Sequence, residues 1–288
     1  MKKLSIFTGI LLLLLASCKS VPDPGVFDQE NLLAWCIVPF DAGKRTPQQR
    51  VLMLKELGIK ALAYDYRSEH IPSFPEEIEL LKRQNIRLQA VWLWVDPRME
   101  ELPDKEGRIV LDMLKDSNSR TEIWLGMPDN AFEGLTDDQS LDLAVRAIGK
   151  IWSQVKALGC TLALYNHGGW YGEPANLVKM AEAVDPEQIK IVYNFHHGHQ
   201  QLEDFGENLE LMLPYLSTIN LNGMRVEGPK ILTLGEGEHE LDMMRKIQDS
   251  EFTGTIGILG HTEGEDILKV LERNLQGLEK LKEELGGS

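Results

Sequence analysis

The chain has 288 residues, of which 43% are hydrophobic and 26% are charged, and its 45 acidic and 30 basic residues give a formal net charge of −15. This composition is ordinary for a protein with a packed core. The acidic balance argues against recognition of nucleic acid or of anionic lipid headgroups, because such contacts come from Lys and Arg.

The first segment of the chain has the pattern of a bacterial lipoprotein leader. Two lysines precede an apolar run at 4–16, and the sequence Leu-Ala-Ser-Cys ends at Cys18, which resembles a lipobox. The run is too short to span ~30 Å of hydrocarbon as a permanent helix. We therefore expect a signal peptide at 1–17, lipidation of Cys18 and a flexible tether at 18–31. The protein would be exported and anchored to a membrane by its lipid alone, facing the periplasm.

Eight apolar runs of strand length follow, separated by segments of helical period. The predicted strands lie at about 32–38, 61–66, 87–95, 122–127, 161–167, 189–197, 217–224 and 255–261. Predicted helices include 46–57, 137–158, 174–184, 204–213, 240–247 and 266–285, with one short helix near 110–114 in the least regular zone. Alternating strands and helices require parallel crossovers. The order predicts an α/β fold, a single-domain (β/α)8 TIM barrel at 32–285.

Polar and aromatic residues gather where the predicted strands end. In a (β/α)8 barrel these ends and the loops after them carry the functional groups. Six of the seven histidines fall there. In strand order the residues are Asp41; Asp65, Arg67 and His70; Trp92 and Trp94; Asp129; Tyr165, Asn166, His167 and Trp170; Asn194, His196, His197 and His199; Asn220, Asn222, Arg225 and Glu227; His261 and Glu263. Because side chains alternate along a strand, only part of the histidine run after 194 is expected to face the barrel axis.

Five motifs at these ends carry a resemblance to a known family. They are LYNHGGW (164–170), YNFHHGH (193–199), INLNG (219–223), LGEGEHELD (234–242) and GTIGILGHTEG (254–264). In these motifs the chain resembles the sugar isomerase/epimerase families with the xylose-isomerase-like TIM barrel. The resemblance implies a divalent metal that polarises the hydroxyl and carbonyl oxygens of a sugar during proton transfer.

Most of the metal ligands that the resemblance implies are replaced in this chain. Only His197 is clearly retained, and an amide offers a metal no more than a neutral oxygen. Two interpretations stay open. In one the site is metal-free and the amides bind sugar hydroxyls. In the other His167, His197 and His261 form a relocated site for Zn, Mn or Ni. The replaced positions correspond to Tyr165, Asn194, Asn220 and either Gly260 or His261.

These observations define the candidate site and two functions. The candidate catalytic residues are His167, His197, Tyr165 and Glu263. The candidate substrate-binding residues are Asn166, Asn194, Asn220, Asn222, Trp170, Trp94, Asp65 and His261. The resemblance implies isomerisation, epimerisation or elimination on an unphosphorylated sugar or keto-sugar glycoside, by proton abstraction next to a carbonyl. The alternative is a non-catalytic carbohydrate-binding lipoprotein derived from the same barrel.

Overall fold

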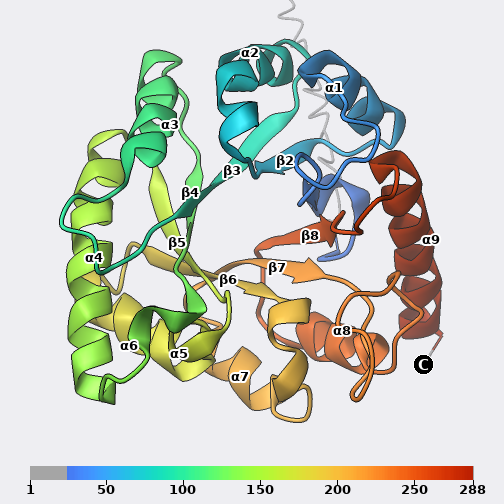
Figure 1. The fold of residues 1–288 in the computed structure, drawn as a ribbon. Helices are drawn as coiled ribbons and strands as arrows, with labels where there is room; N and C mark the ends of the chain where they lie inside the picture. Colours follow the sequence, from blue (N-terminus) through green and yellow to red (C-terminus); the bar gives the residue numbers. More distant parts are fainter. Residues whose placement is uncertain (1–24, 288) are drawn as a thin grey trace, which may run out of the picture.

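The computed structural model describes residues 25–287, which form one closed barrel of parallel strands. Each strand pairs with its neighbours in chain order, and the first strand closes the barrel by pairing with the last (Figure 1). The prediction of a single-domain (β/α)8 barrel is confirmed. The strands are β1 (Leu32–Trp35), β2 (Ala61–Tyr64), β3 (Arg87–Trp94), β4 (Glu122–Gly126), β5 (Thr161–Tyr165), β6 (Ile189–Asn194), β7 (Leu216–Leu221) and β8 (Thr255–Leu259).

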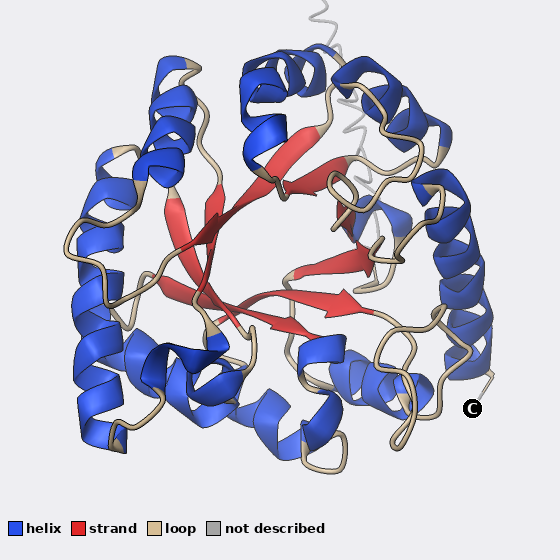
Figure 2. Cartoon of the chain, viewed as in Figure 1, coloured by secondary structure: helices blue, strands red, loops and turns tan. Residues whose placement is uncertain are grey.

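Helices surround the strands as an outer layer, which Figure 2 shows as a blue ring around the red barrel. Thr46 and Thr136 begin α1 and α4 with capping boxes, in which each threonine pairs with a glutamine three residues later. In the least regular zone Asp104 caps a full-length helix, longer than predicted. The helices are α1 (Pro47–Glu56), α2 (Phe74–Arg83), α3 (Lys105–Asp116), α4 (Asp137–Ala157), α5 (Gly169–Gly172), α6 (Pro174–Val184), α7 (Phe205–Met212), α8 (Glu240–Asp249) and α9 (Ile267–Gly286).

The strands end earlier than predicted, and this difference reshapes the site. β6 stops at Asn194, and Phe195–His197 forms a turn of 3-10 helix instead of continuing the strand. The alternation expected along 189–197 therefore fails after Asn194, because a 3-10 turn does not send successive side chains to opposite faces. Alternation would separate His196 from His197, but both reach the cavity described below, whereas His199 does not line it.

The interior of the barrel is filled by aromatic rings from β1, β4 and β5. Trp35, Trp124 and Tyr165 meet there, with the two indole rings 4.8 Å apart in an edge-to-face arrangement. Large rings fit because small residues face them from β2, β3 and β5, namely Ala61, Ala63, Ala90 and Ala163. The complementary set of strand residues, such as Leu32 and Ala34 in β1, packs outward against the helices. The aromatic group forms the floor under the carboxyl ends of the strands.

The segment before β1 is packed rather than free. Phe27 is buried in the outer core, and the Asn31 amide donates hydrogen bonds to the carbonyls of Val26 and Gly254. The flexible tether predicted at 18–31 therefore cannot extend beyond about residue 25. The predicted signal peptide and Cys18 lie outside the described residues. Within 25–287, no helix combines the length and the apolar character needed to cross a membrane.

Candidate active site

A cavity of about 250 Å³ opens at the carboxyl ends of the strands, above the aromatic floor. Its wall joins residues from loops after most of the strands. The titratable members are Cys36, Asp65, Arg67, Asp129, His167, His196, His197, Lys230 and His261. The remaining members are Trp35, Phe40, Trp92, Tyr165 and Ile231. A shallower groove of about 420 Å³ shares Arg67, Trp92 and His167 with the cavity and continues past Trp94.

His167 stands at the end of β5 in a fixed orientation. Its Nδ1 lies 2.9 Å from the Asp129 Oδ1, and its ring meets the Trp94 ring edge to face at 4.8 Å. A carboxylate on one ring nitrogen selects the tautomer and leaves the other nitrogen, Nε2, for a ligand. The centroids of the His167 and His197 rings are 4.6 Å apart, so the two residues expected to face one another do so.

His196 and His197 are neutral imidazoles at the back of the cavity. Burial lowers the pKa of His196 to about 3, helped by the nearby His261 and Lys230. Burial likewise lowers the pKa of His197 far below its usual range, and the adjacent His196 adds to the effect. A neutral imidazole carries one N–H donor and one acceptor nitrogen. His196 Nδ1 is buried and has no hydrogen-bond partner among the described residues.

Asp65 is a buried carboxyl in the same cavity. Only 2% of the residue is exposed, its Oδ1 accepts a 3.4 Å hydrogen bond from the Val38 amide, and its Oδ2 has no partner among the described residues. Burial raises the pKa of Asp65 to about 7, although the Arg67 charge opposes the rise. A carboxyl with a pKa near neutrality is populated both with and without its proton, as acid–base catalysis requires. The sequence analysis placed Asp65 among the substrate contacts and did not anticipate this acid–base character.

Tyr165 belongs to the floor. Its hydroxyl oxygen accepts a 3.1 Å hydrogen bond from the Trp35 indole, and burial raises its pKa well above the usual value. The neutral phenol therefore holds its proton throughout the physiological range. Its ring also meets His197 edge to face at 5.6 Å, so it sets the position of that imidazole from below.

Of the four strand-end amides beneath the cavity, three bond to one another and the fourth, Asn222, binds neighbouring backbone. The Asn166 side-chain oxygen accepts from the backbone and side-chain N–H groups of Asn194, at 2.7 and 2.8 Å. The Asn194 side-chain oxygen in turn accepts from Asn220 at 2.7 Å. Asn222 binds the His196 amide and the Lys230 carbonyl. The expectation that these amides bind sugar hydroxyls is therefore corrected. Their hydrogen-bonding groups tie together the ends of β5, β6 and β7, and none of them lines the cavity.

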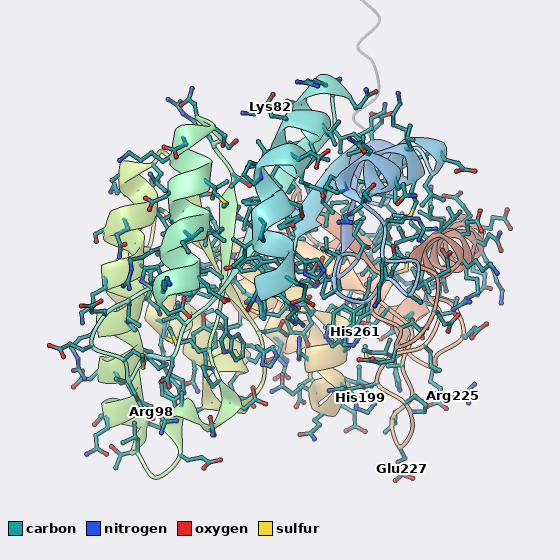
Figure 3. The ribbon with its side chains drawn as sticks, turned by 45° about the horizontal axis from the view of Figure 1, so that its top comes forward. Lys82, Arg98, His199, Arg225, Glu227 and His261 are labelled. Carbon is teal, nitrogen blue, oxygen red and sulfur yellow. The ribbon has the colours of Figure 1, made fainter. Side chains whose placement is uncertain are left out.

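Other predicted site residues lie outside the cavity. The Trp170 indole donates to Asp137 and packs on Phe132, which corrects its assignment as a sugar contact. The Glu263 side chain is 86% exposed and lies 3.7 Å from the His261 Nε2, on the solvent side of that ring. It is therefore not a cavity base. Figure 3 shows the predicted loop carboxylate Glu227 at the tip of a loop that extends away from His261.

The sequence matches no known family profile and no curated protein, whereas the fold matches solved structures over most of its length. A 3-keto-D-glucoside 4-epimerase from E. coli shares 14% identity and superposes with a TM-score of 0.65, covering 87% of this chain and 99% of its own. A D-psicose 3-epimerase crystallised with D-fructose shares 14% identity at a TM-score of 0.66, covering 89% and 99%. A xylose isomerase-like TIM barrel protein from Mycobacterium smegmatis, in complex with magnesium, shares 14% identity at 0.57, covering 86% and 92%. The chain has the xylose-isomerase-like TIM-barrel fold.

The metal that this xylose-isomerase-like fold implies does not fit the residues present. Where the resemblance calls for anionic or imidazole ligands, Asn194 and Asn220 engage each other, and Tyr165 accepts from an indole. A Cβ at Gly257 would lie 1.6 Å from the Asn220 side-chain oxygen, so that amide fills the space beside β8. Neutral amides already bonded to each other are poor ligands for a divalent cation.

The relocated imidazole site is not formed either. His261 stacks on Phe40, in the loop after β1, with ring centroids 3.6 Å apart, whereas the His167 ring packs against the His197 ring at 4.6 Å. Within residues 25–287 no group of three or more His, Cys, Asp or Glu side chains is arranged to hold a metal ion. The proposal of His167, His197 and His261 as a ligand set is corrected accordingly.

Several groups of this site could not be identified from the sequence. Asp129 and Arg67 were noted at strand ends, but nothing in the sequence indicated that Asp129 binds His167, which is 38 positions away. His196 was left undecided by the alternation argument. Lys230 lies in a loop without any period, and only the fold brings it over the cavity.

Proposed function

We propose that this chain is a sugar isomerase or epimerase, or an eliminating enzyme of the same proton-transfer kind, that acts on an unphosphorylated sugar or keto-sugar glycoside without a bound metal. One observation carries the proposal. The buried, unpaired Asp65 carboxyl faces the same cavity as the His167 imidazole held by Asp129. Two sugar epimerases among the structures of similar fold support the same reaction class.

Two such groups supply what the chemistry requires. One group removes a proton from a carbon next to a carbonyl, and the other returns a proton to the opposite face of that carbon or to its neighbour. Asp65 is half ionised near neutral pH, so it serves either direction. The Nε2 of His167 is the matching group, since Nδ1 is occupied by Asp129.

The negative charge that develops on the sugar oxygen needs donors already in place. The neutral imidazoles of His196 and His197 each carry one N–H, and their burial makes such a donor stronger than it would be in water. The Trp92 ring lines the same wall, where the apolar face of a sugar ring can stack. The residues of this chain thus provide the two proton carriers, the oxyanion donors and a platform.

Deuterium exchange tests the proposal directly. The full chain is incubated in D2O with a panel of unphosphorylated aldoses, ketoses and 3-keto glycosides, and incorporation next to the carbonyl is followed by NMR. Asp65→Asn and His167→Gln should each slow the exchange about 10²-fold or more. The matched control Asp112→Asn, at an exposed position of α3, should exchange at the unmodified rate. Absence of exchange across the panel contradicts the proposal.

A non-catalytic carbohydrate-binding protein is the second candidate. The observation that favours it is the replacement of the implied metal ligands by Tyr165, Asn194 and Asn220, which leaves the cavity in place without the original electrophile. Calorimetric binding of a sugar with no deuterium incorporation would select this candidate over the enzyme.

We also propose export and lipid anchoring at Cys18, on the strength of the leader pattern alone. Fractionation of producing bacterial cells tests it. The cells are also grown with a labelled fatty acid. The unmodified chain should sediment with membranes and carry the labelled fatty acid, and Cys18→Ser should not carry it. Equal labelling of both proteins contradicts the assignment.

A further inference from the structure

Two cationic side chains line the cavity without an ion-pair partner. They are Arg67, directly after β2, and Lys230, in the excursion after β7. Ion pairs occur at many other Lys and Arg residues, but no carboxylate among residues 25–287 lies within 4.0 Å of the charged nitrogens of these two. The chain as a whole is acidic, with 45 acidic and 30 basic residues, whereas this cavity carries two cations that no carboxylate in the described part of the chain pairs with.

The Arg67 side chain is held in place. One guanidinium nitrogen donates to the Tyr66 carbonyl at 2.8 Å, and the guanidinium carbon lies 5.5 Å from the Phe40 ring centroid and 5.6 Å from that of Trp92. These aromatic contacts fix the plane of the fork without neutralising its charge. The remaining N–H groups are therefore ready to bind a planar anion.

Lys230 is placed by the backbone around it. Its carbonyl accepts from the buried Asn222 side chain at 2.9 Å, and a single bridge between Gly223 and Leu232 closes the same excursion. Its charge contributes to the lowered pKa values of His196, His197 and His261, as expected of a cation above these rings.

The charges of Arg67 and Lys230 both affect the part of the cavity around His261. Both Arg67 and Lys230 contribute to the lowered pKa of His261, whose ring stacks on Phe40. Burial raises the pKa of Asp65 to about 7, and the Arg67 charge opposes this rise. Arg67 and Lys230 thus bring positive charge to the part of the cavity beside His261, whereas the His167 ring lies against the Asp129 carboxylate.

We propose that the ligand of this cavity is a sugar acid, whose carboxylate is bound between Arg67 and Lys230 beside His261. A carboxylate matches the planar fork of Arg67, and a second cation completes its charge. The hydroxyls of a neutral sugar can accept hydrogen bonds from these groups but carry no negative charge to balance them. This inference rests on the proposed function for its reaction, but the binding of the acid stands or fails by itself.

Calorimetry with matched ligands tests the inference on the full chain. The methyl glycosides of D-glucuronate, D-galacturonate and D-mannuronate are each compared with the matching methyl hexoside, which differs only at the carboxylate. At least one acid should bind ten times or more tightly than its neutral partner. Raising the salt concentration should reduce the preference. D-glucose 6-phosphate is the further arm, because tighter binding of the phosphate than of every acid would overturn the choice of a carboxylate.

Variants identify the residues responsible. Arg67→Gln and Lys230→Gln should each weaken acid binding several-fold and leave neutral sugars unchanged, and the double variant should remove the preference. Lys230→Arg should restore most of it. Lys82→Gln is the matched control, since Figure 3 shows Lys82 at the far end of α2 from His261. Thermal melting of each variant shows that the exposed substitutions leave the fold intact.

The outcomes separate this inference from the proposed function. Equal affinity for acid and neutral sugars, no binding of any acid, or a preference that survives in the double variant overturns the sugar-acid assignment. Deuterium exchange into neutral sugars would then leave the proton-transfer enzyme standing. Preferential acid binding with no deuterium exchange into the neutral sugars or into the keto forms of the preferred acid supports the inference and contradicts the enzyme.

Discussion

Replacing Asp65 by asparagine should change the free energy of unfolding, relative to that of the unmodified protein, in favour of the variant as the pH rises. The same substitution removes the proposed proton carrier. Burial raises the pKa of Asp65 from 3.8 to about 7. As the pH rises from about 4 to about 7, the unfolded chain releases this proton and the folded protein retains it. The folded state of the unmodified protein therefore loses stability through this window, and the loss is complete above about pH 8. An amide at the same position does not titrate.

The size of the effect follows from the shift. A change of about three pKa units at 1.36 kcal/mol per unit corresponds to about 4 kcal/mol of unfolding free energy. The stability of Asp65→Asn relative to the unmodified protein should therefore be about 4 kcal/mol more favourable at pH 8 than at pH 4. In a domain of this size, that difference corresponds to roughly 10 °C in the melting temperature.

Denaturant unfolding at pH 4 and pH 8 measures this difference. Other titrating groups, such as the buried Glu77, are present in both proteins and cancel in the comparison. Asp112→Asn, on the exposed face of α3, controls for the loss of a negative charge and should show little pH dependence relative to the unmodified protein. A pH-independent difference for Asp65→Asn would refute the reasoning, because Asp65 would then titrate alike in the folded and unfolded states.

Three further predictions concern the rest of the site. Asp129→Asn should slow deuterium exchange on the order of 10²-fold while ligand affinity measured by calorimetry stays the same, because the amide no longer fixes the His167 tautomer. Elemental analysis of the purified full chain should find less than one equivalent of divalent metal, and dialysis against a chelator should leave ligand affinity and melting temperature unchanged; a stoichiometric metal lost with function would contradict the amide arrangement. In Gly126→Ala the new Cβ would lie 2.9 Å from the Trp94 ring and 3.2 Å from the Trp92 indole nitrogen. We therefore expect the free energy of unfolding, measured in denaturant, to fall by about 1–3 kcal/mol and sugar binding to weaken. Unchanged stability would show that both rings can move.

The sequence specified the fold more completely than the site. Apolar runs separated by amphipathic helices predict eight alternating units, and caps such as Thr46 mark where helices begin. The ends of the strands were predicted too long because apolar and aromatic residues continue beyond the last ladder hydrogen bond, as Phe195 does after β6. The hydrogen bonds between two strands end where the partner strand ends, and this depends on the tertiary structure rather than on the local sequence.

The site was predicted in its location and only partly in its chemistry. The facing of His167 and His197 followed from their strand-end positions. The roles of the amides did not, because whether Asn194 bonds to a sugar or to Asn166 depends on the distance between β5 and β6. The acid–base character of Asp65 arises from burial by residues distant in the chain, and no local pattern encodes it.

The ladder from Asn166 through Asn194 to Asn220 also constrains how this barrel can change by mutation. Replacing Asn194 alone by an aspartate would remove the side-chain N–H group that donates to Asn166, leaving only the backbone N–H, and would place a charge in a buried position without a cation. A larger residue at Gly257 would collide with Asn220. Each single step toward an anionic ligand at these positions is therefore expected to destabilise the protein, and only combined changes that also remodel the aromatic floor would avoid this. The amide ladder thus makes these positions depend on one another, so that the effects of substitutions there are expected to be non-additive.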